Sequence, residues 1–557
     1  MKKISFITVL ITATLVIAVA QNRKSSPKAP VAELPRHPKL VVGIVIDQMR
    51  YDYLNRYWNK FGNDGFKRLL SQGTNFDQTN YNYMPTYTGP GHASIFTGTT
   101  PAVHGIIGNN WYEREEGKTV YCAEDKTIKP VGSGAEEGLR SPRRMLAGTI
   151  GDQLHLSNNA QSKVVGVALK DRSAIMPAGH TANAAFWYDG ASANFISSSY
   201  YMKELPAYMQ EFNKQAHPAR LLQEDWNTLL PIDQYTESLA DNNPYEGRFK
   251  GEDAPVFPHK LPVLKEKNGN MGIIRSTPQG NVLTRLVAEA IIKGENLGKN
   301  TASDFLSVSF SSPDYIGHMY GPQSIEVEDC YLRLDLEIAS FLRFLDSWCG
   351  KNNTLVFLTA DHGAVENPQF LNDVGIPSGF FNDKVMMDSL KLELKKKFAD
   401  SLVLAYENEQ VFFDRPRMER KGIDKRAVED FCAGYLMKFK GVAHVMTAHQ
   451  MAMSEFISTP RREVQKGYNF RRSGDVCVLL QPGWVGDWDR VTGTTHGAPW
   501  SYDTHVPLIF WGWKVRPVVS DIPVEITDIA PTVCTMLGVQ FPHGCTGKTI
   551  PATLFWR

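Results

Sequence analysis

Long apolar runs, each followed by a polar residue, are the clearest pattern along the chain. Residues Leu40 to Ile46 form a continuous apolar run that ends at Asp47. The segments SDFLSVSFSSPD and NTLVFLTADHG repeat this design and reach Asp314 and Asp361 at or just past their ends. A fourth run of this kind, HVPLIFWG, begins at His505. Apolar runs of this length predict buried strands of a parallel sheet.

Helical periodicity separates these runs. The stretch VEDCYLRLDLEIASFLRF, residues 327–344, has apolar positions three and four residues apart, as in a helix with one buried face. Alternating strands and helices predict an α/β fold with a mostly parallel central sheet and helices on both faces. Ligands bind at the carboxyl ends of the strands in such sheets. One aspartate after a strand commonly caps a helix or forms a turn, but three of them, two with histidines nearby, indicate a site.

Two segments fit this alternation less well. Residues 176–300 are rich in Tyr, Asn and Pro, and residues 367–489 contain amphipathic stretches such as KRAVEDFCAGYLMKF. We interpret both segments as insertions that cap the active face of one catalytic domain, which spans residues 39–557. Loops at that face usually carry specificity.

The N-terminus has the composition of an export signal. Residues 1–20 combine two lysines with an apolar stretch and end in Ala18-Val19-Ala20, a small-x-small cleavage site. We interpret them as a signal peptide, followed by a flexible, Pro-rich lead-in over residues 21–38. An uncleaved membrane anchor is the alternative, because the apolar stretch is close to the shortest length that spans a bilayer. The expected location is secreted or periplasmic, with no stable membrane association after cleavage.

Charge and cysteine content bear on the possible partners. Lys and Arg total 60 against 59 Asp and Glu, a net charge of +1, and no long basic run occurs. This balance argues against a nucleic-acid partner. The seven cysteines include no C-x-x-C pair, so their spacing does not resemble a zinc-thiolate site. Their odd number allows at most three disulfides, which the sequence cannot pair. Oligomeric state cannot be read from the sequence.

Carboxylates and imidazoles recur at metal-ligand spacing. DYIGHMYG places Asp314 and His318 four residues apart, which puts both on one face of a helical turn. ADHG places Asp361 beside His362, and His496 lies in the Gly-rich loop VTGTTHGAPW. Zinc in catalytic sites takes three such ligands and keeps an open position, although manganese or iron would accept the same donor types. The residues divide evenly, which predicts two Zn²⁺ ions, one held by Asp47, Asp361 and His362 and the other by Asp314, His318 and His496.

The segment MPTYTGPGHAS carries two candidate nucleophiles, Thr86 and Thr88. A threonine hydroxyl attacks at neutral pH only when a base or a metal ion lowers its pKa. Gly89-Pro90-Gly91 places a proline where helices commonly begin. Backbone N–H groups and the positive end of a helix dipole are therefore expected next to these hydroxyls.

The order of these motifs resembles that of the alkaline phosphatase superfamily over most of the mature length. The family pattern is a strand-end Asp, the nucleophile, D-x-x-x-H, D-H and a late H-G loop, and all five occur here in that order. PTYT is similar to the P-T-x-T of the superfamily's phosphodiesterases and of PafA-type phosphate-irrepressible alkaline phosphatases. The resemblance implies that Thr88 is the nucleophile and a metal ligand, and that Asn109, Lys170 and Arg172 contact the phosphoryl group.

The resemblance further implies an exported di-zinc alkaline phosphatase that hydrolyses small-molecule phosphate monoesters through a phosphothreonine at Thr88. The Lys170 and Arg172 pair lies in a strand-like segment and fits this substrate, because an ammonium and a guanidinium can stabilise a doubly charged phosphoryl group. A phosphodiesterase or nucleotide pyrophosphatase with the same ligands and threonine is the main alternative. An inactive metal-dependent binding protein is a further one. The sequence around Thr88 departs from the C/S-x-P-x-R of the sulfatases.

Overall fold

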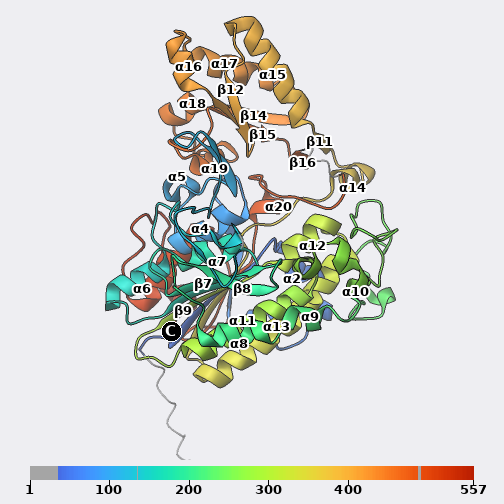
Figure 1. The fold of residues 1–557 in the computed structure, drawn as a ribbon, viewed down its shortest axis with the longest axis vertical. Coiled ribbons are helices and arrows are strands. Elements are labelled where there is room, and N and C mark those ends of the chain that lie inside the picture. The colour runs from blue at the N-terminus through green and yellow to red at the C-terminus, as the bar shows by residue number, and fades with distance from the viewer. Residues whose placement is uncertain (1–35, 135, 487–490, 557) are drawn as a thin grey trace, which may run out of the picture. The chain divides into compact units, whose positions relative to one another are not determined.

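The computed structural model describes residues 36–134, 136–486 and 491–556 (Figure 1). The predicted signal peptide, residues 1–20, and nearly all of the lead-in, residues 21–38, lie outside the described residues. Within the described segments, no helix combines the length and the hydropathy needed to cross a membrane. All seven cysteines lie in these segments and are free thiols.

A ten-stranded sheet forms the centre of the fold (Figure 1), in the order β18-β2-β17-β10-β1-β9-β6-β7-β8-β5. β1 pairs in parallel with β10 and β9, and β6 pairs in parallel with β9 and β7. This centre confirms the predicted α/β fold, whereas β17, the run expected after His505, is antiparallel to β10. The strands are β1 (Leu40–Ile46), β2 (Thr74–Asn80), β5 (Pro130–Val131), β6 (Val164–Ala168), β7 (Ala184–Asp189), β8 (Asn194–Ser198), β9 (Asp304–Phe310), β10 (Thr354–Thr359), β17 (Leu508–Gly512) and β18 (Val518–Glu525).

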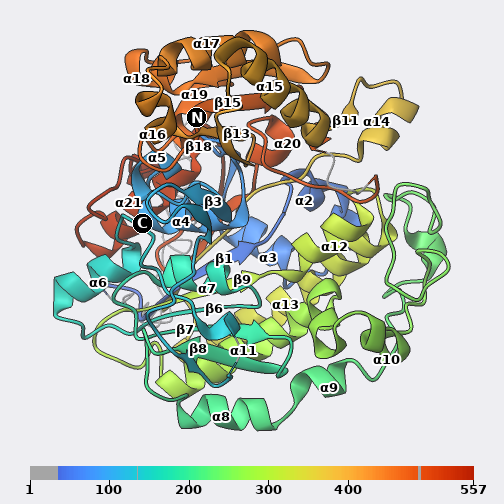
Figure 2. The same ribbon diagram turned by 45° about the horizontal axis from the view of Figure 1, so that its top comes forward.

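Helices cover the central strands. Every residue of β1, β9 and β10 is buried, so both faces of the sheet must be covered. α4 packs with α7, and α11 packs with α13 (Figure 2). The longer helices are α4 (Thr88–Thr97), α6 (Ile150–Asn158), α7 (Asp171–Ala178), α8 (Ala207–Lys214), α11 (Gln279–Glu295), α12 (Ser312–Tyr320), α13 (Ile325–Cys349), α15 (Asp383–Phe398), α17 (Lys425–Leu436) and α21 (Ile529–Leu537).

Three neighbouring strands each deliver an aspartate to the same edge of the sheet. Asp47 follows β1 directly, and its N–H donates to the carbonyl oxygen of Phe310 at the end of β9, at 3.0 Å. Asp314 lies in the first turn of α12, which follows β9, and Asp361 lies just past β10. Because β1 lies between β9 and β10, the three carboxylates converge at the carboxyl ends of the strands, where such sheets bind ligands.

A separate hydrophobic core lies within residues 381–480 (orange in Figure 1). Side chains of α15, α17 and a second sheet, in the order β12-β13-β15-β14, form this core. β11 and β16, at the two ends of this segment in sequence, form a short parallel pair. Segment 176–300, by contrast, includes β7, β8 and α11, which belong to the central sheet and its helices. The interpretation of both segments as capping insertions stays a prediction. The bounds are β11 (Gly379–Phe381), β12 (Val403–Glu407), β13 (Gln410–Phe413), β14 (Val442–Thr447), β15 (Val476–Leu480) and β16 (Trp484–Gly486).

The close approach of α4 to the end of β10 depends on Gly91. A Cβ atom at Gly91 would lie 2.4 Å from the carbonyl oxygen of Asp361, whereas one at Gly434 in α17 would meet nothing within 4 Å. We expect Gly91→Ala to lower the free energy of unfolding by about 1–3 kcal/mol, because packed backbone must shift. Gly434→Ala adds a better helix former and should leave stability unchanged or raise it by up to about 1 kcal/mol. Thermal and urea unfolding measure both, and equal effects would contradict the close contact.

Candidate active site

Thr88 is the first residue of α4, and Tyr87 is the extended residue before it. Thr88 is 1% exposed, and its hydroxyl oxygen lies 3.4 Å from Nη2 of Arg172. The Thr86 hydroxyl instead donates to the carbonyl oxygen of Ala498, at 3.1 Å. The two threonines therefore have different surroundings. Thr88 faces the Arg172 guanidinium at the start of α4, whereas Thr86 hydrogen-bonds to the loop that contains Ala498.

The first predicted ligand group is fully buried. Nε2 of His362 lies 3.5 Å from Asp47 Oδ1 and 3.5 Å from Asp361 Oδ2. Its other ring nitrogen, Nδ1, lies 2.9 Å from the carbonyl oxygen of Gly363, which holds Nε2 toward the carboxylates. None of the described residues forms a hydrogen bond with Asp47 Oδ1, Asp361 Oδ2 or His362 Nε2. Buried polar atoms normally have partners, so this arrangement fits a bound cation.

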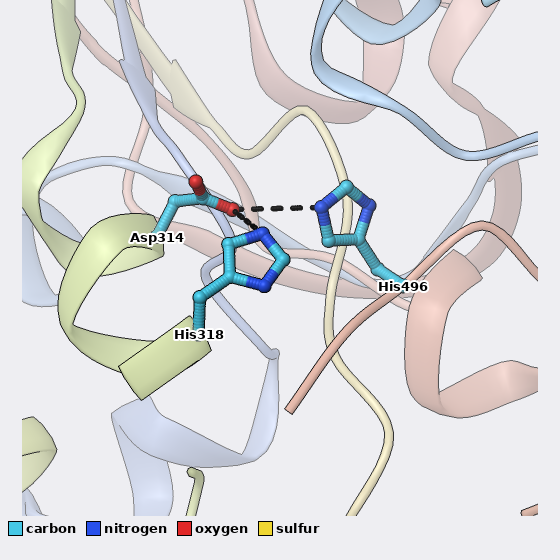
Figure 3. A group of neighbouring side chains, drawn as sticks. All are labelled: Asp314, His318 and His496. Atoms are coloured by element: carbon cyan, nitrogen blue, oxygen red, sulfur yellow. Dashed lines mark ion pairs between the residues drawn. The ribbon is translucent and has the colours of Figure 1, made fainter. Parts of the chain in front are cut away.

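Figure 3 shows the second group, in which His318 and His496 turn toward one oxygen of Asp314. Asp314 Oδ1 lies 3.2 Å from Nε2 of His318 and 3.5 Å from Nε2 of His496. The Nδ1 atoms lie 2.8 Å from the carbonyl oxygens of Thr494 and Thr86, respectively. A backbone contact thus fixes each ring and leaves its Nε2 for a metal ion, as in the first group.

The two ligand groups are in contact through their histidines but differ in exposure to solvent. The rings of His362 and His496 stack, with centroids 3.4 Å apart and 11° between their planes. The side chain of His318 is 30% exposed, compared with 0% for His362. Solvent therefore reaches the site at the second group, while the first group lies beneath it.

Lys170 links the two groups. Its Nζ lies 2.7 Å from Asp47 Oδ2 and 2.5 Å from Asp314 Oδ2, and its side chain is buried. The ammonium therefore contacts one carboxylate from each group. The resemblance assigned Lys170 to the phosphoryl group, and the structure places its ammonium between the two ligand groups.

Asn109 and Arg172 contact the start of α4. Asn109 Oδ1 accepts the N–H of Gly89 at 2.8 Å. Arg172 reaches the Thr88 hydroxyl through Nη2, and its Nη1 lies 3.3 Å from the hydroxyl of Tyr121. All three residues that the resemblance assigns to the phosphoryl group thus lie around the same helix end and ligand groups.

Burial sets the charge state of the ligands. Burial raises the pKa of Asp47 to about 6, although the Lys170 ammonium opposes this. Burial, reinforced by the nearby Asp47 carboxylate, also raises the pKa of Asp361 well above its usual value. The pKa of His362 is lowered by burial, so its imidazole is neutral, which is the form that binds metals. The described side chains leave these acids short of compensating positive charge.

Two residues that the sequence patterns did not reveal support the ligands. Gln48 donates its N–H to Asp361 Oδ1 at 3.1 Å and its Nε2–H to Asp314 Oδ1 at 2.9 Å, so it connects both groups. It does so with a φ of 63°, in the left-handed region that a glutamine seldom adopts. Asp503 accepts the N–H of Gly497 at 2.8 Å and so supports the loop of the late histidine. Neither residue belongs to a motif, so spacing alone carried no signal for them.

Comparison with known proteins places these features in a family. The model of the type I phosphodiesterase / nucleotide pyrophosphatase family matches residues 41–499. Alkaline phosphatase PafA from Elizabethkingia meningoseptica is 46% identical over 519 residues, which cover 93% of this chain and 94% of that protein. Two further relatives are a Myroides odoratus protein named calcium-transporting ATPase, at 45% identity, and alkaline phosphatase PhoV from Synechococcus elongatus, at 44%. They cover 92% and 97% of this chain and 94% and 97% of their own lengths.

A solved structure gives the same picture. The crystal structure of wild-type alkaline phosphatase PafA superposes with a TM-score of 0.89 at 45% identity, and covers 93% of this chain and 99% of that one. This match confirms the resemblance predicted from the order of the motifs. The chain therefore belongs to the type I phosphodiesterase / nucleotide pyrophosphatase family.

Proposed function

We propose that this protein is an exported alkaline phosphatase that hydrolyses small-molecule phosphate monoesters, with Thr88 as nucleophile and two Zn²⁺ ions as cofactors. The observation that carries the proposal is the Thr88 hydroxyl at the start of α4, 3.4 Å from the Arg172 guanidinium, on a helix that abuts Asp361. Relatives named alkaline phosphatase match over more than nine-tenths of the chain. Export rests on the composition of residues 1–20.

The donor atoms of both groups suit zinc. The first group offers two carboxylates and one imidazole, and the second offers one carboxylate and two imidazoles. These are borderline-hard oxygen and nitrogen donors of the kind that zinc takes in catalytic sites. By resemblance, Thr88 would complete the first group. Bound zinc would supply positive charge that stabilises the negative charge developing on the reacting oxygens.

The side chains divide the reaction between them. The Thr88 oxygen loses its proton and bonds to phosphorus while the bond from phosphorus to the leaving oxygen breaks. Lys170, Arg172 and Asn109 hold the remaining phosphoryl oxygens, and backbone N–H groups at the start of α4 add to them. The leaving oxygen takes up a proton and departs as an alcohol. Water then displaces Thr88 from the phosphothreonine, which releases inorganic phosphate.

A phosphodiesterase or nucleotide pyrophosphatase is the second candidate function, because the matching family carries that description. It would use the same ligands and the same threonine. A diester, however, carries one negative charge fewer than a monoester. Two buried or half-buried cations at one phosphoryl site, Lys170 and Arg172, supply more positive charge than a diester requires. This charge excess favours the monoester. An inactive binding protein would need no nucleophile at Thr88.

Replacement of the nucleophile tests the covalent step. We expect Thr88→Ala to lower kcat/KM for p-nitrophenyl phosphate by at least about 1,000-fold and to abolish phosphoenzyme formation, because no other hydroxyl replaces it. Zinc content should persist, since three ligands remain in each group. Thr88→Ser keeps the hydroxyl and serves as the matched control, which should still form a trappable phosphoenzyme. Full activity in Thr88→Ala would point to another nucleophile, whereas absence of activity in the zinc-loaded wild-type protein would support the inactive binding protein.

Removal of one cation tests the choice of substrate. Arg172→Ala should lower kcat/KM for p-nitrophenyl phosphate by about 100-fold but for bis-p-nitrophenyl phosphate by less than about 10-fold, because the dianion gains more from the guanidinium. Arg426→Ala, at a side chain that is 65% exposed on α17, is the control and should change neither value. Equal losses for the two substrates, or a larger wild-type kcat/KM for the diester, would favour the phosphodiesterase.

A further inference from the structure

Two adjoining cavities open beside the second ligand group. The larger has a volume of about 310 Å³ and reaches His318, and the smaller reaches His496 and Tyr87. Four residues line both cavities, so the two are parts of one space: Val365, Val485, Gly486 and Thr495. A volume of this size accommodates a small organic group.

Apolar side chains line both parts of this space, together with threonine side chains and glycine backbone. Phe380, Pro368 and Val485 line the larger part, and Met84, Leu479, Leu480 and Trp484 line the smaller part. Glu409 and Asp503 are the carboxyl groups on its walls. No lysine or arginine lines either part within the described chain. An anionic group that entered would lose its hydration without gaining a cationic partner from these walls.

A short parallel ribbon of two strands, β11 and β16, forms part of the cavity lining. β11 and β16 pair with Phe380 opposite Val485, so these two side chains lie in register. Phe380 lines the larger cavity, and Val485 lines both. This part of the apolar surface therefore depends on the pairing of β11 with β16, which are far apart in the sequence.

The cavity adjoins the second ligand group, and the residues proposed to hold the phosphoryl group do not line it. Thr88, Lys170 and Arg172 do not line it, whereas His318 and His496 do. In a displacement at phosphorus, the leaving oxygen departs opposite the attacking oxygen. Because Arg172 lies beside Thr88, the leaving group of a monoester attacked by Thr88 would point away from both, toward the second ligand group and this space.

We propose that this cavity binds the leaving group of the phosphate monoester and selects uncharged aryl or alkyl groups over anionic ones. The proposal rests on the proposed monoesterase function and adds the class of alcohol that the enzyme prefers. Apolar burial favours the uncharged group, and the carboxyl groups on the walls disfavour an anionic one.

Two esters of matched reactivity test this selection. 4-Methylphenyl phosphate and 4-(carboxymethyl)phenyl phosphate have similar phenol leaving groups but differ by one carboxylate. We expect kcat/KM of the zinc-loaded enzyme to be at least tenfold higher for 4-methylphenyl phosphate than for 4-(carboxymethyl)phenyl phosphate. Val485→Lys places an ammonium on the shared wall and should lower this ratio by about tenfold. Val485→Leu keeps the wall apolar and should preserve the ratio.

A lysine elsewhere controls for general charge effects. Val519 lies on β18, is 67% exposed and does not line the cavity, so Val519→Lys should leave the ratio unchanged. Equal kcat/KM values for the two esters would overturn the cavity proposal while the monoesterase function stands. The same shift in Val519→Lys as in Val485→Lys would also overturn it. Failure to hydrolyse either ester would overturn both proposals.

Discussion

The burial of three carboxylates at the ends of neighbouring parallel strands is the constraint on which the rest of the site depends. β9, β1 and β10 bring Asp314, Asp47 and Asp361 together, and all three side chains are buried. Like charges repel strongly there, because the local dielectric constant is low. Lys170 contacts two of these acids but not the third. The unpartnered oxygens of Asp47 and Asp361 mark where bound cations would supply the remaining positive charge.

The same constraint explains why backbone atoms orient the ligands. His318, His362 and His496 each direct Nδ1 to a backbone carbonyl oxygen, so their Nε2 atoms face the carboxylates. Gln48 then connects one carboxylate of each group, at the cost of a left-handed backbone conformation. Because the groups are joined in this way, a shift of one would move the other. A site held like this is organised before it binds metal or substrate.

The sequence predicted those parts of the protein that depend on local pattern. Apolar runs that end in aspartate identified β1, β9 and β10, and the D-x-x-x-H spacing placed Asp314 and His318 on one helical turn. The antiparallel direction of β17 could not be predicted, since a buried strand shows the same apolar run in either direction. The role of Gln48 depends on its contact with α12, and the cavity depends on the pairing of β11 with β16. Such contacts between distant segments leave no periodicity in the sequence.

The two ends of the site are built from different parts of the fold. The two ligand groups, Lys170 and Arg172 come mainly from segments that adjoin the central sheet, and their positions follow from strands buried on both faces. Part of the cavity lining comes from a ribbon of two short strands, β11 and β16, which contribute Phe380 and Val485. A substitution in a fully buried strand disturbs packing on two faces, whereas Phe380 and Val485 on the ribbon are half-buried and line the cavity. If the cavity binds the leaving group as proposed, substitutions on the ribbon would change the preference for the alcohol and leave the buried ligand groups in place.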